Sequence, residues 1–232
     1  MSTAPLWGEY ERLRPSQIDG IKAAAPIAYL PWGSLEWHSY HNPIGLDGLK
    51  AHALCNVMAA ETGGVVLPTV FIGTDTIKPY KGFKHTIDHP FETVRTLCAE
   101  FLTQLADEGF KVIVLLTGHY GGGQVRAVTE AGDEFAQSNP DIGLWVFAEW
   151  QPLVGQFEAN HAAIGETSFM LSMEPETVDI SQLPEDRVAT LDQDGVWGED
   201  PRRATAEIGH QQTRALVQVA VPKILSLLEN HT

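Results

Sequence analysis

The chain has 232 residues, of which 44% are hydrophobic and 19% charged, an ordinary globular balance. Its formal net charge of −15 argues against nucleic-acid binding, which needs a basic surface, and no apolar run approaches the length of a membrane span. The two cysteines, Cys55 and Cys98, form neither a disulfide framework nor a CxxC pair. We therefore expect a cytoplasmic protein, with a single domain over residues 1–232.

Strand-like and helix-like segments alternate along the chain. In chain order the patterns predict a strand at 26–32, a helix at 47–61, a strand at 64–73, a helix at 90–108, a strand at 111–118, a helix at 124–137, a strand at 143–150, and helices at 166–173 and 204–229. The strands read as apolar on both faces, which predicts an α/β fold with a mainly parallel sheet covered on both sides by helices.

Polar segments follow three of the predicted strands. They read GSLEWH after the first strand, TGHYGGGQ after the strand at 111–118, and AEWQPL at the end of the strand at 143–150. Because ligands of such folds bind beyond the carboxyl ends of the strands, we expect these three segments to meet at one edge of the sheet.

Four side chains in these segments and after them have the chemistry of metal ligands. Glu36 and His38 are two residues apart, so in an extended segment they point to one face. Asp47 follows nine residues later, across a loop containing proline and glycine, and His119 comes directly after the most apolar strand. Oxygen and nitrogen ligands without cysteine suit zinc, manganese or iron(II), and several carboxylates suit a pair of ions.

Each of these residues also has a simpler interpretation. A histidine in a loop is usually a solvated or hydrogen-bonded side chain, and Asp47 stands where it could be only the N-cap of the helix at 47–61. The TGHYGGG segment has no lysine and no GKS/T, so it is not a Walker-type phosphate loop. The joint pattern, in which all the segments follow predicted strands, favours the metal site.

Several motifs, in the same order along the chain, resemble those of the creatininase (creatinine amidohydrolase) family. The family's Gly-Ser/Ala-x-Glu-x-His motif and later Asp match Gly33, Ser34, Glu36, His38 and Asp47. Its Gly-His segment after a central strand matches Gly118, His119 and Tyr120, and its His-Ala/Gly-x-x-x-Glu-Thr-Ser segment matches His161, Ala162, Glu166, Thr167 and Ser168.

The resemblance implies a three-layer α/β/α fold and a metal-dependent hydrolase that forms a homohexamer. It implies that Glu36, His38, Asp47 and His119 bind one or two divalent ions, zinc or manganese and in some members iron, with Asp47 as the bridge. It also matches His161 to a histidine that moves a proton near the metal-bound water, a role that suits an imidazole titrating near neutral pH.

Three departures from the family pattern bear on the site. The acidic ligand that creatininase has two residues after the Gly-His histidine is Gly121 here, and Glu166 could supply the missing carboxylate. The residue between Glu36 and His38, commonly Gln in the family, is Trp37 here. The KGFKHTIDHP stretch lacks the Pro-Gly-Thr that the family often has near the middle of the chain. Together these departures argue against assuming creatinine as the substrate.

Four aromatic residues are candidates for the substrate pocket. Trp150 resembles the aromatic residue that lines the creatininase pocket, and Phe157 stands at a similar place before His161. We add Tyr120 and Trp37 because both lie within the ligand motifs. An aromatic wall could hold a flat or ring-shaped substrate, although core packing explains Phe157 equally well.

We therefore predict a metal-dependent amidohydrolase in which a metal-bound hydroxide cleaves a C–N bond of a small cyclic or planar amide, such as a creatinine-like or lactam-like ring. His161 and Glu166 are the predicted catalytic residues, and Glu166 is also a candidate ligand. The alternatives are a formamide hydrolase, a peptide-trimming member of the same superfamily, a non-catalytic relative that binds metal or another ligand, and a structural α/β protein without metal.

Overall fold

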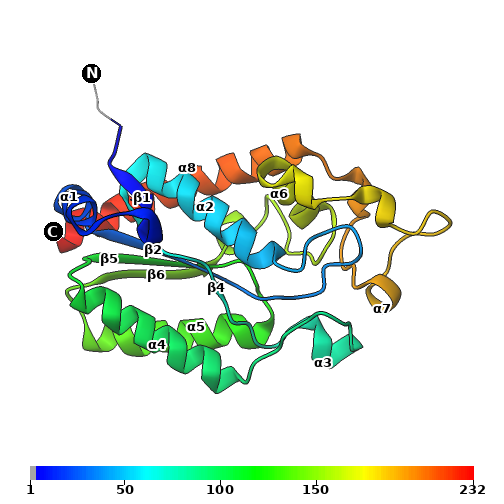
Figure 1. The fold of residues 1–232 in the computed structure, drawn as a ribbon, viewed down its shortest axis with the longest axis horizontal. Helices are drawn as coiled ribbons and strands as arrows, with labels where there is room; N and C mark the ends of the chain where they lie inside the picture. Colours follow the sequence, from blue (N-terminus) through cyan, green and yellow to red (C-terminus); the bar gives the residue numbers. More distant parts are fainter. Residues whose placement is uncertain (1–3) are drawn as a thin grey trace.

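A six-stranded sheet forms the centre of the computed structural model, which describes residues 4–232 (Figure 1). Its order is β1-β3-β2-β5-β6, and β4 pairs with the end of β2. All the strand pairings are parallel, which confirms the predicted sheet. The strands are β1 (Trp7–Glu9), β2 (Ile27–Gly33), β3 (Gly64–Val66), β4 (Val70–Phe71), β5 (Val112–Thr117) and β6 (Gly143–Ala148).

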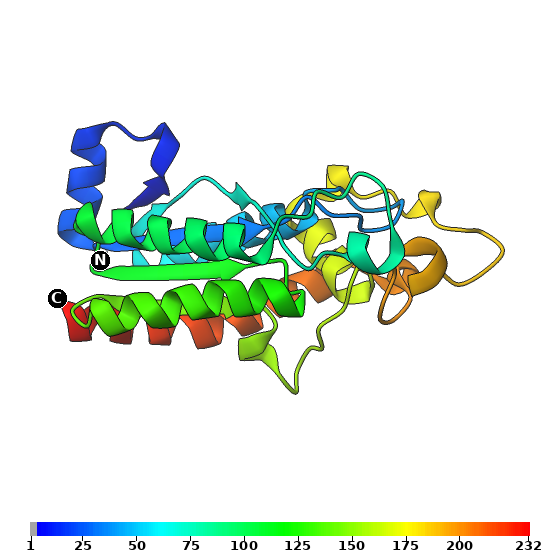
Figure 2. The same ribbon diagram turned by 90° about the horizontal axis from the view of Figure 1, so that it is seen from below.

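Helices cover both faces of the sheet, as Figures 1 and 2 show. The helices are α1 (Pro15–Ala24), α2 (Leu46–Thr62), α3 (Ile77–Lys81), α4 (Phe91–Asp107), α5 (Gly122–Ser138), α6 (Ile164–Met173), α7 (Leu191–Asp194) and α8 (Ala206–His231). Helices α2 and α8 pack on one face with Tyr29 and Val114, and α4 and α5 pack on the other with Leu30 and Leu115. Neighbouring residues of a strand point to opposite faces, so both faces of β2 and β5 are apolar.

The elements depart from the predicted ones in a few places. The single strand expected at 64–73 is two strands, β3 and β4, which both pair with β2. Pro68 lies between them, and proline has no backbone N–H to donate to the sheet. The N-cap of α2 is Gly45, so Asp47 lies inside the first turn and does not cap the helix. Strand β1 and helices α1, α3 and α7 have too few periodic residues to be recognised from pattern.

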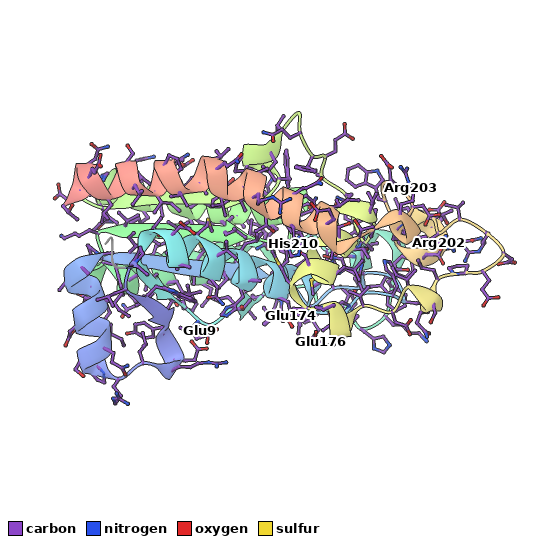
Figure 3. The ribbon with its side chains drawn as sticks, turned by 90° about the horizontal axis from the view of Figure 1, so that it is seen from above. Glu9, Glu174, Glu176, Arg202, Arg203 and His210 are labelled. Carbon is purple, nitrogen blue, oxygen red and sulfur yellow. The ribbon has the colours of Figure 1, made fainter. Side chains whose placement is uncertain are left out.

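Loops gather where β2, β5 and β6 end, at the right of Figure 2. An isolated bridge joins Leu35 to Ile87 there, and another joins His161 to Trp197. Arg202, labelled in Figure 3, donates to the Arg187 carbonyl at 3.1 Å, which ties the loop before α7 to the start of α8. Among the described residues, no helix combines the length and the apolar character needed to cross a bilayer.

Close backbone contacts hold the start of α2 against the ends of β2 and β5. A Cβ added to Gly33 would lie 2.3 Å from the Gly48 nitrogen, and one added to Gly118 would lie 2.1 Å from the Asp47 carbonyl oxygen. Neither distance leaves room for a side chain, so glycine at both positions is what lets the helix approach. The position of Asp47 therefore depends on these two contacts.

We expect Gly118→Ala to lower the free energy of unfolding by about 1–3 kcal/mol, because the added methyl group meets backbone that cannot rotate away. The matched control is Gly20→Ala in α1, where an added Cβ meets nothing within 4 Å. Gly20→Ala should be neutral or stabilising by roughly 0.5–1 kcal/mol, as alanine favours a helix interior. Urea denaturation measures both, and equal stabilities for the two variants would contradict the packing argument.

Candidate metal centre

Five of the predicted site residues meet beyond the strand ends. Glu36 and His38 follow β2, Asp47 lies in the first turn of α2, His119 follows β5, and Glu166 lies in the first turn of α6. All five are at most 5% exposed. Their potential ligand atoms form two compact groups that share Asp47: Glu36, Asp47 and His119 in one, and His38, Asp47 and Glu166 in the other.

The first group is built around Nδ1 of His119. This nitrogen lies 2.8 Å from Glu36 Oε2 and 3.4 Å from Asp47 Oδ2. Ser34 donates its hydroxyl to Asp47 Oδ2 at 2.5 Å, and the backbone N–H of Ile77 donates to the other Glu36 oxygen. One oxygen of each carboxylate thus faces the histidine while neighbouring groups hold the carboxylates in place.

The second group is built around Nε2 of His38, which is fully buried. This nitrogen lies 3.2 Å from Asp47 Oδ1 and 3.6 Å from Glu166 Oε2, and it has no hydrogen-bond partner. Two ligands bound to one ion at about 2.0–2.2 Å lie roughly 3–3.6 Å apart, so both separations fit ligands around a shared ion.

Backbone carbonyls determine which nitrogen of each histidine is available. His119 Nε2 lies 3.0 Å from the Thr74 carbonyl oxygen, and His38 Nδ1 lies 3.0 Å from the Glu36 carbonyl oxygen. A carbonyl only accepts, so these nitrogens carry the hydrogen, and the opposite nitrogens present lone pairs to the carboxylates. A carbonyl behind the ring is the usual outer partner of a histidine that binds a metal.

The electrostatics of both groups favour a cation. Burial alone lowers the pKa of His38, but the carboxylates of Asp47 and Glu166 outweigh it and raise that pKa to about 9. Burial opposes charge on His119 in the same way, and Glu36 and Asp47 raise its pKa well above the usual value. Without another cation, the carboxylates stabilise a proton at the place where a metal ion would sit.

His161 lies beside the two groups. Its ring centroid is 4.3 Å from that of His38, and its Nε2 lies 2.9 Å from the Trp37 carbonyl oxygen, which leaves Nδ1 as the free nitrogen. Burial is the main cause that lowers the pKa of His161, and the neighbouring His38 lowers it further. A neutral imidazole with one free nitrogen is suited to accept a proton. A third group of candidate ligand atoms joins His161 to Glu36 and His38.

Gly121 cannot be replaced by an acid in this backbone arrangement. A Cβ at this position would lie 2.3 Å from the Asp75 carbonyl oxygen and 3.1 Å from His119 Nε2. The segment around Asp75 therefore takes the space in which a side chain at position 121 would begin. The only carboxylate placed to complete the second group, among the described residues, is Glu166.

Two buried charged residues that we did not predict lie behind Glu166. Lys50 Nζ is 2.8 Å from Glu166 Oε1 and 2.6 Å from Glu149 Oε1. Burial opposes the charge of Lys50, but Glu149 and Glu166 outweigh it and raise its pKa. Burial raises the pKa of Glu149 to about 7, although Lys50 acts against that rise.

A cavity of about 350 Å³ opens onto the metal-ligand groups. Its walls include five of the candidate site residues: Glu36, Asp47, His119, His161 and Glu166. The other lining residues are mainly apolar or aromatic, namely Ile77, Tyr80, Tyr120, Leu191 and Trp197. Lys81 is the one lysine or arginine among the lining residues. The exposed faces of Tyr80 and Trp197 stand at this opening.

The structure places three of the four predicted pocket aromatics elsewhere. Tyr120 lines the main cavity, whereas Trp150 and Phe157 line a smaller one on the other side of Tyr120 and Glu166. Trp37 lines neither cavity, because it stacks on Phe83 at 5.5 Å and donates its ring N–H to the Asp194 carbonyl at 2.8 Å.

Some of the missed residues do leave a signal in the sequence. Lys50 interrupts the apolar stripe of α2, at helical spacing from Leu46 and Leu54, and a lysine in a buried stripe calls for a carboxylate partner. Glu149 follows the apolar strand β6 directly. Leu191 and Trp197 had no such signal, because contacts with distant residues bring them to the site: the Trp37 ring N–H donates to the Asp194 carbonyl in α7, and Trp197 forms a bridge with His161.

Known proteins share both the sequence pattern and the fold. The family model for creatinine amidohydrolase (creatininase) matches residues 11–224. The creatinine amidohydrolase of Pseudomonas putida is 26% identical over 219 residues, which cover 86% of this chain and 82% of that protein. A mutant creatininase of the Zn–Zn type has a TM-score of 0.82 at 21% identity, over 98% of this chain and 99% of that one. A manganese creatininase has a TM-score of 0.79 at 22% identity, over 96% and 98%.

These matches confirm the predicted creatininase-like α/β fold. The match to the family model covers nearly the whole chain, and the motif residues on which the resemblance rested lie within it. The chain therefore belongs to the creatininase family, and it is a hydrolase that acts on a C–N bond outside peptides.

Proposed function

We propose that this chain is a metal-dependent amidohydrolase that uses two divalent ions, zinc or manganese, to cleave a C–N bond of a small cyclic or planar amide. The observation that carries the proposal is the pair of buried ligand groups that share Asp47. A carboxylate that bridges two ions is the usual core of a two-metal hydrolytic site.

The residues fit the ions in three ways. His38 Nε2 is buried without a hydrogen-bond partner and faces two carboxylates. The separations between potential ligand atoms suit a shared ion, as described above. Four buried carboxylates, those of Glu36, Asp47, Glu149 and Glu166, stand against the one ammonium of Lys50, and this excess of negative charge calls for cations.

Bound ions of this kind polarise an amide carbonyl and lower the pKa of water. The chain's own residues then handle the proton. The free Nδ1 of His161 accepts a proton from the attacking water and returns it to the leaving nitrogen, while the Trp37 carbonyl holds the ring in the required tautomer. Ser34 and the Ile77 N–H keep Asp47 and Glu36 oriented through these steps.

The cavity favours a small substrate over a peptide. A volume of about 350 Å³ is near the lower end for ligand pockets, and the walls of Tyr80, Leu191 and Trp197 suit a flat, mainly apolar body. The relative from Pseudomonas putida acts, by its name, on creatinine. This chain has Gly121 where creatininase has an acidic ligand, and the backbone of Asp75 fills the space beside it. For this reason the proposal extends to lactam-like amides and does not assume creatinine.

Formamides are the second candidate substrates. Small formamides also fit within a cavity of about 350 Å³. Their hydrolysis gives formate, whereas a cyclic amide gives a single ring-opened product. Product analysis on a panel of both classes separates the two activities. The family resemblance implies assembly into a homohexamer, which light scattering of the purified protein tests. The cytoplasmic location expected from the sequence stays a prediction.

We expect the wild-type protein to hold about two ions per chain, measured by elemental analysis after purification without chelator or nickel. His119→Ala should remove one ion, as His119 belongs only to the first group, and Asp47→Asn should remove both. The control is His210→Ala, an exposed position in α8 that is labelled in Figure 3. Two ions retained in Asp47→Asn would rule out the shared-ligand assignment.

His161→Ala should keep both ions and lower kcat by roughly 10²–10⁴-fold, because it removes a group that transfers protons and no ligand. Metal content and kcat are measured on the same preparation. If the variant loses an ion instead, His161 is a ligand in the group with Glu36 and His38.

Trp197→Ala should raise KM for planar amides by about 10-fold or more, since it removes one wall of the main cavity, and Trp197→Phe should restore most of the affinity. Trp150→Phe is the comparison, because Trp150 lines only the smaller cavity. A raised KM in Trp150→Phe with an unchanged one in Trp197→Ala would mean that the substrate occupies the smaller cavity.

A further inference from the structure

Lys50 lies on the buried face of α2, one turn after Asp47, and its side chain is fully inaccessible to solvent. Its Nζ lies between Glu149 Oε1 at 2.6 Å and Glu166 Oε1 at 2.8 Å, and 4.8 Å from the centre of the Tyr120 ring. The helix that supplies the shared carboxylate of the site therefore also supplies a cation directly behind the site.

Stability alone does not explain this buried pair. Apolar residues of similar volume often replace a buried ion pair without loss of stability, because removing charges from water is unfavourable. Elsewhere on its buried face α2 has apolar residues, Leu54 and Met58 among them, that pack in the core between the sheet and α8. A role at the neighbouring site is the better explanation.

The contacts of Glu166 indicate what that role is. Its Oε1 accepts from Lys50 at 2.8 Å and from the Tyr120 hydroxyl at 2.8 Å. Its Oε2 accepts from the Ala162 N–H at 2.7 Å and points toward His38 Nε2. The two oxygens thus have different partners, and any rotation of the carboxylate would break contacts on both sides.

We propose that Lys50, held by Glu149, is a positioning residue that fixes Glu166 as a single-oxygen ligand of the second ion. This arrangement replaces an acidic ligand at position 121, where the Asp75 carbonyl leaves no room for a side chain. The inference rests on the proposed two-metal function and adds to it the means by which the second group is completed.

The test is the double substitution Lys50→Met/Glu149→Leu, which removes one cation and one carboxylate at similar volume, while Glu166 keeps the Tyr120 hydroxyl and the Ala162 N–H as donors. Metal-free protein is titrated with manganese, with calorimetry to resolve two affinities and electron paramagnetic resonance to detect coupling between the two ions. We expect the first affinity to be unchanged and the second to fall by about 10–100-fold, the usual effect of losing an outer partner of a ligand. The control is Met58→Leu, a volume-conserving change on the same buried side of α2.

Each outcome bears on the inference separately from the proposed function. A wild-type protein that takes up two ions, with a double variant that binds both as tightly, overturns the role of Lys50 alone. A wild-type protein without a second ion overturns both proposals. If the double variant does not fold, Glu149→Gln takes its place, because this substitution keeps the volume and removes the charge that balances Lys50. We expect the affinity for the second manganese ion to fall several-fold in Glu149→Gln. An unchanged affinity for that ion overturns the inference.

Discussion

The site depends on the close backbone approach of α2 to the ends of β2 and β5. Gly33 and Gly118 allow this approach because neither carries a side chain between the strand ends and the helix, and Gly48 leaves room for Phe71 of β4 beside it. The approach brings Asp47 between His38 and His119, which come from two different strand ends. Without this contact the two histidines would have separate surroundings, and no carboxylate would be shared between them.

The buried charges follow from this arrangement. A carboxylate held away from water needs a cation or several hydrogen bonds. Here backbone N–H groups of Ile77 and Ala162 donate to the carboxylates, and the carboxylates raise the pKa of His38 and His119, so that a proton or a bound ion faces them. The Ile77 N–H and the ammonium of Lys50 hold the oxygens of Glu36 and Glu166 that face away from the histidines, whereas Ser34 donates to the Asp47 oxygen that faces His119. Both oxygens of Asp47 and one oxygen each of Glu36 and Glu166 face the histidines, so the same network both stabilises the carboxylates and directs them.

The loops above the site account for the chain's departures from the family pattern. The Thr74–Thr76 backbone accepts the His119 N–H and covers Gly121, so one segment supports the first group and removes the room for an acid in the second. Trp37, which replaces a common glutamine, stacks on Phe83 and anchors the loop near α7. The outer wall of the cavity includes residues of α3 and α7 together with Trp197.

Local sequence determined the elements and the identity of the main ligands. Apolar runs and helical spacing identified the strands and long helices, because these patterns reflect burial that the fold later provides. Glu36, His38, Asp47 and His119 were recognisable as candidate ligands from their residue types and their places after predicted strands, and Glu166 from the family motif that also contains His161. The organisation of the chain as a single domain stays a prediction.

Tertiary structure alone decided which atoms meet. The pairing of His38 with Glu166, the partnership of Lys50 with Glu149, and the position of Trp197 beside His161 each join residues more than 30 positions apart. Trp150 and Phe157 stand close to His161 in the sequence, yet they line the smaller cavity and not the main one. Spacing along a chain predicts contacts within one element or across a short loop, whereas contacts between distant elements depend on how the layers pack.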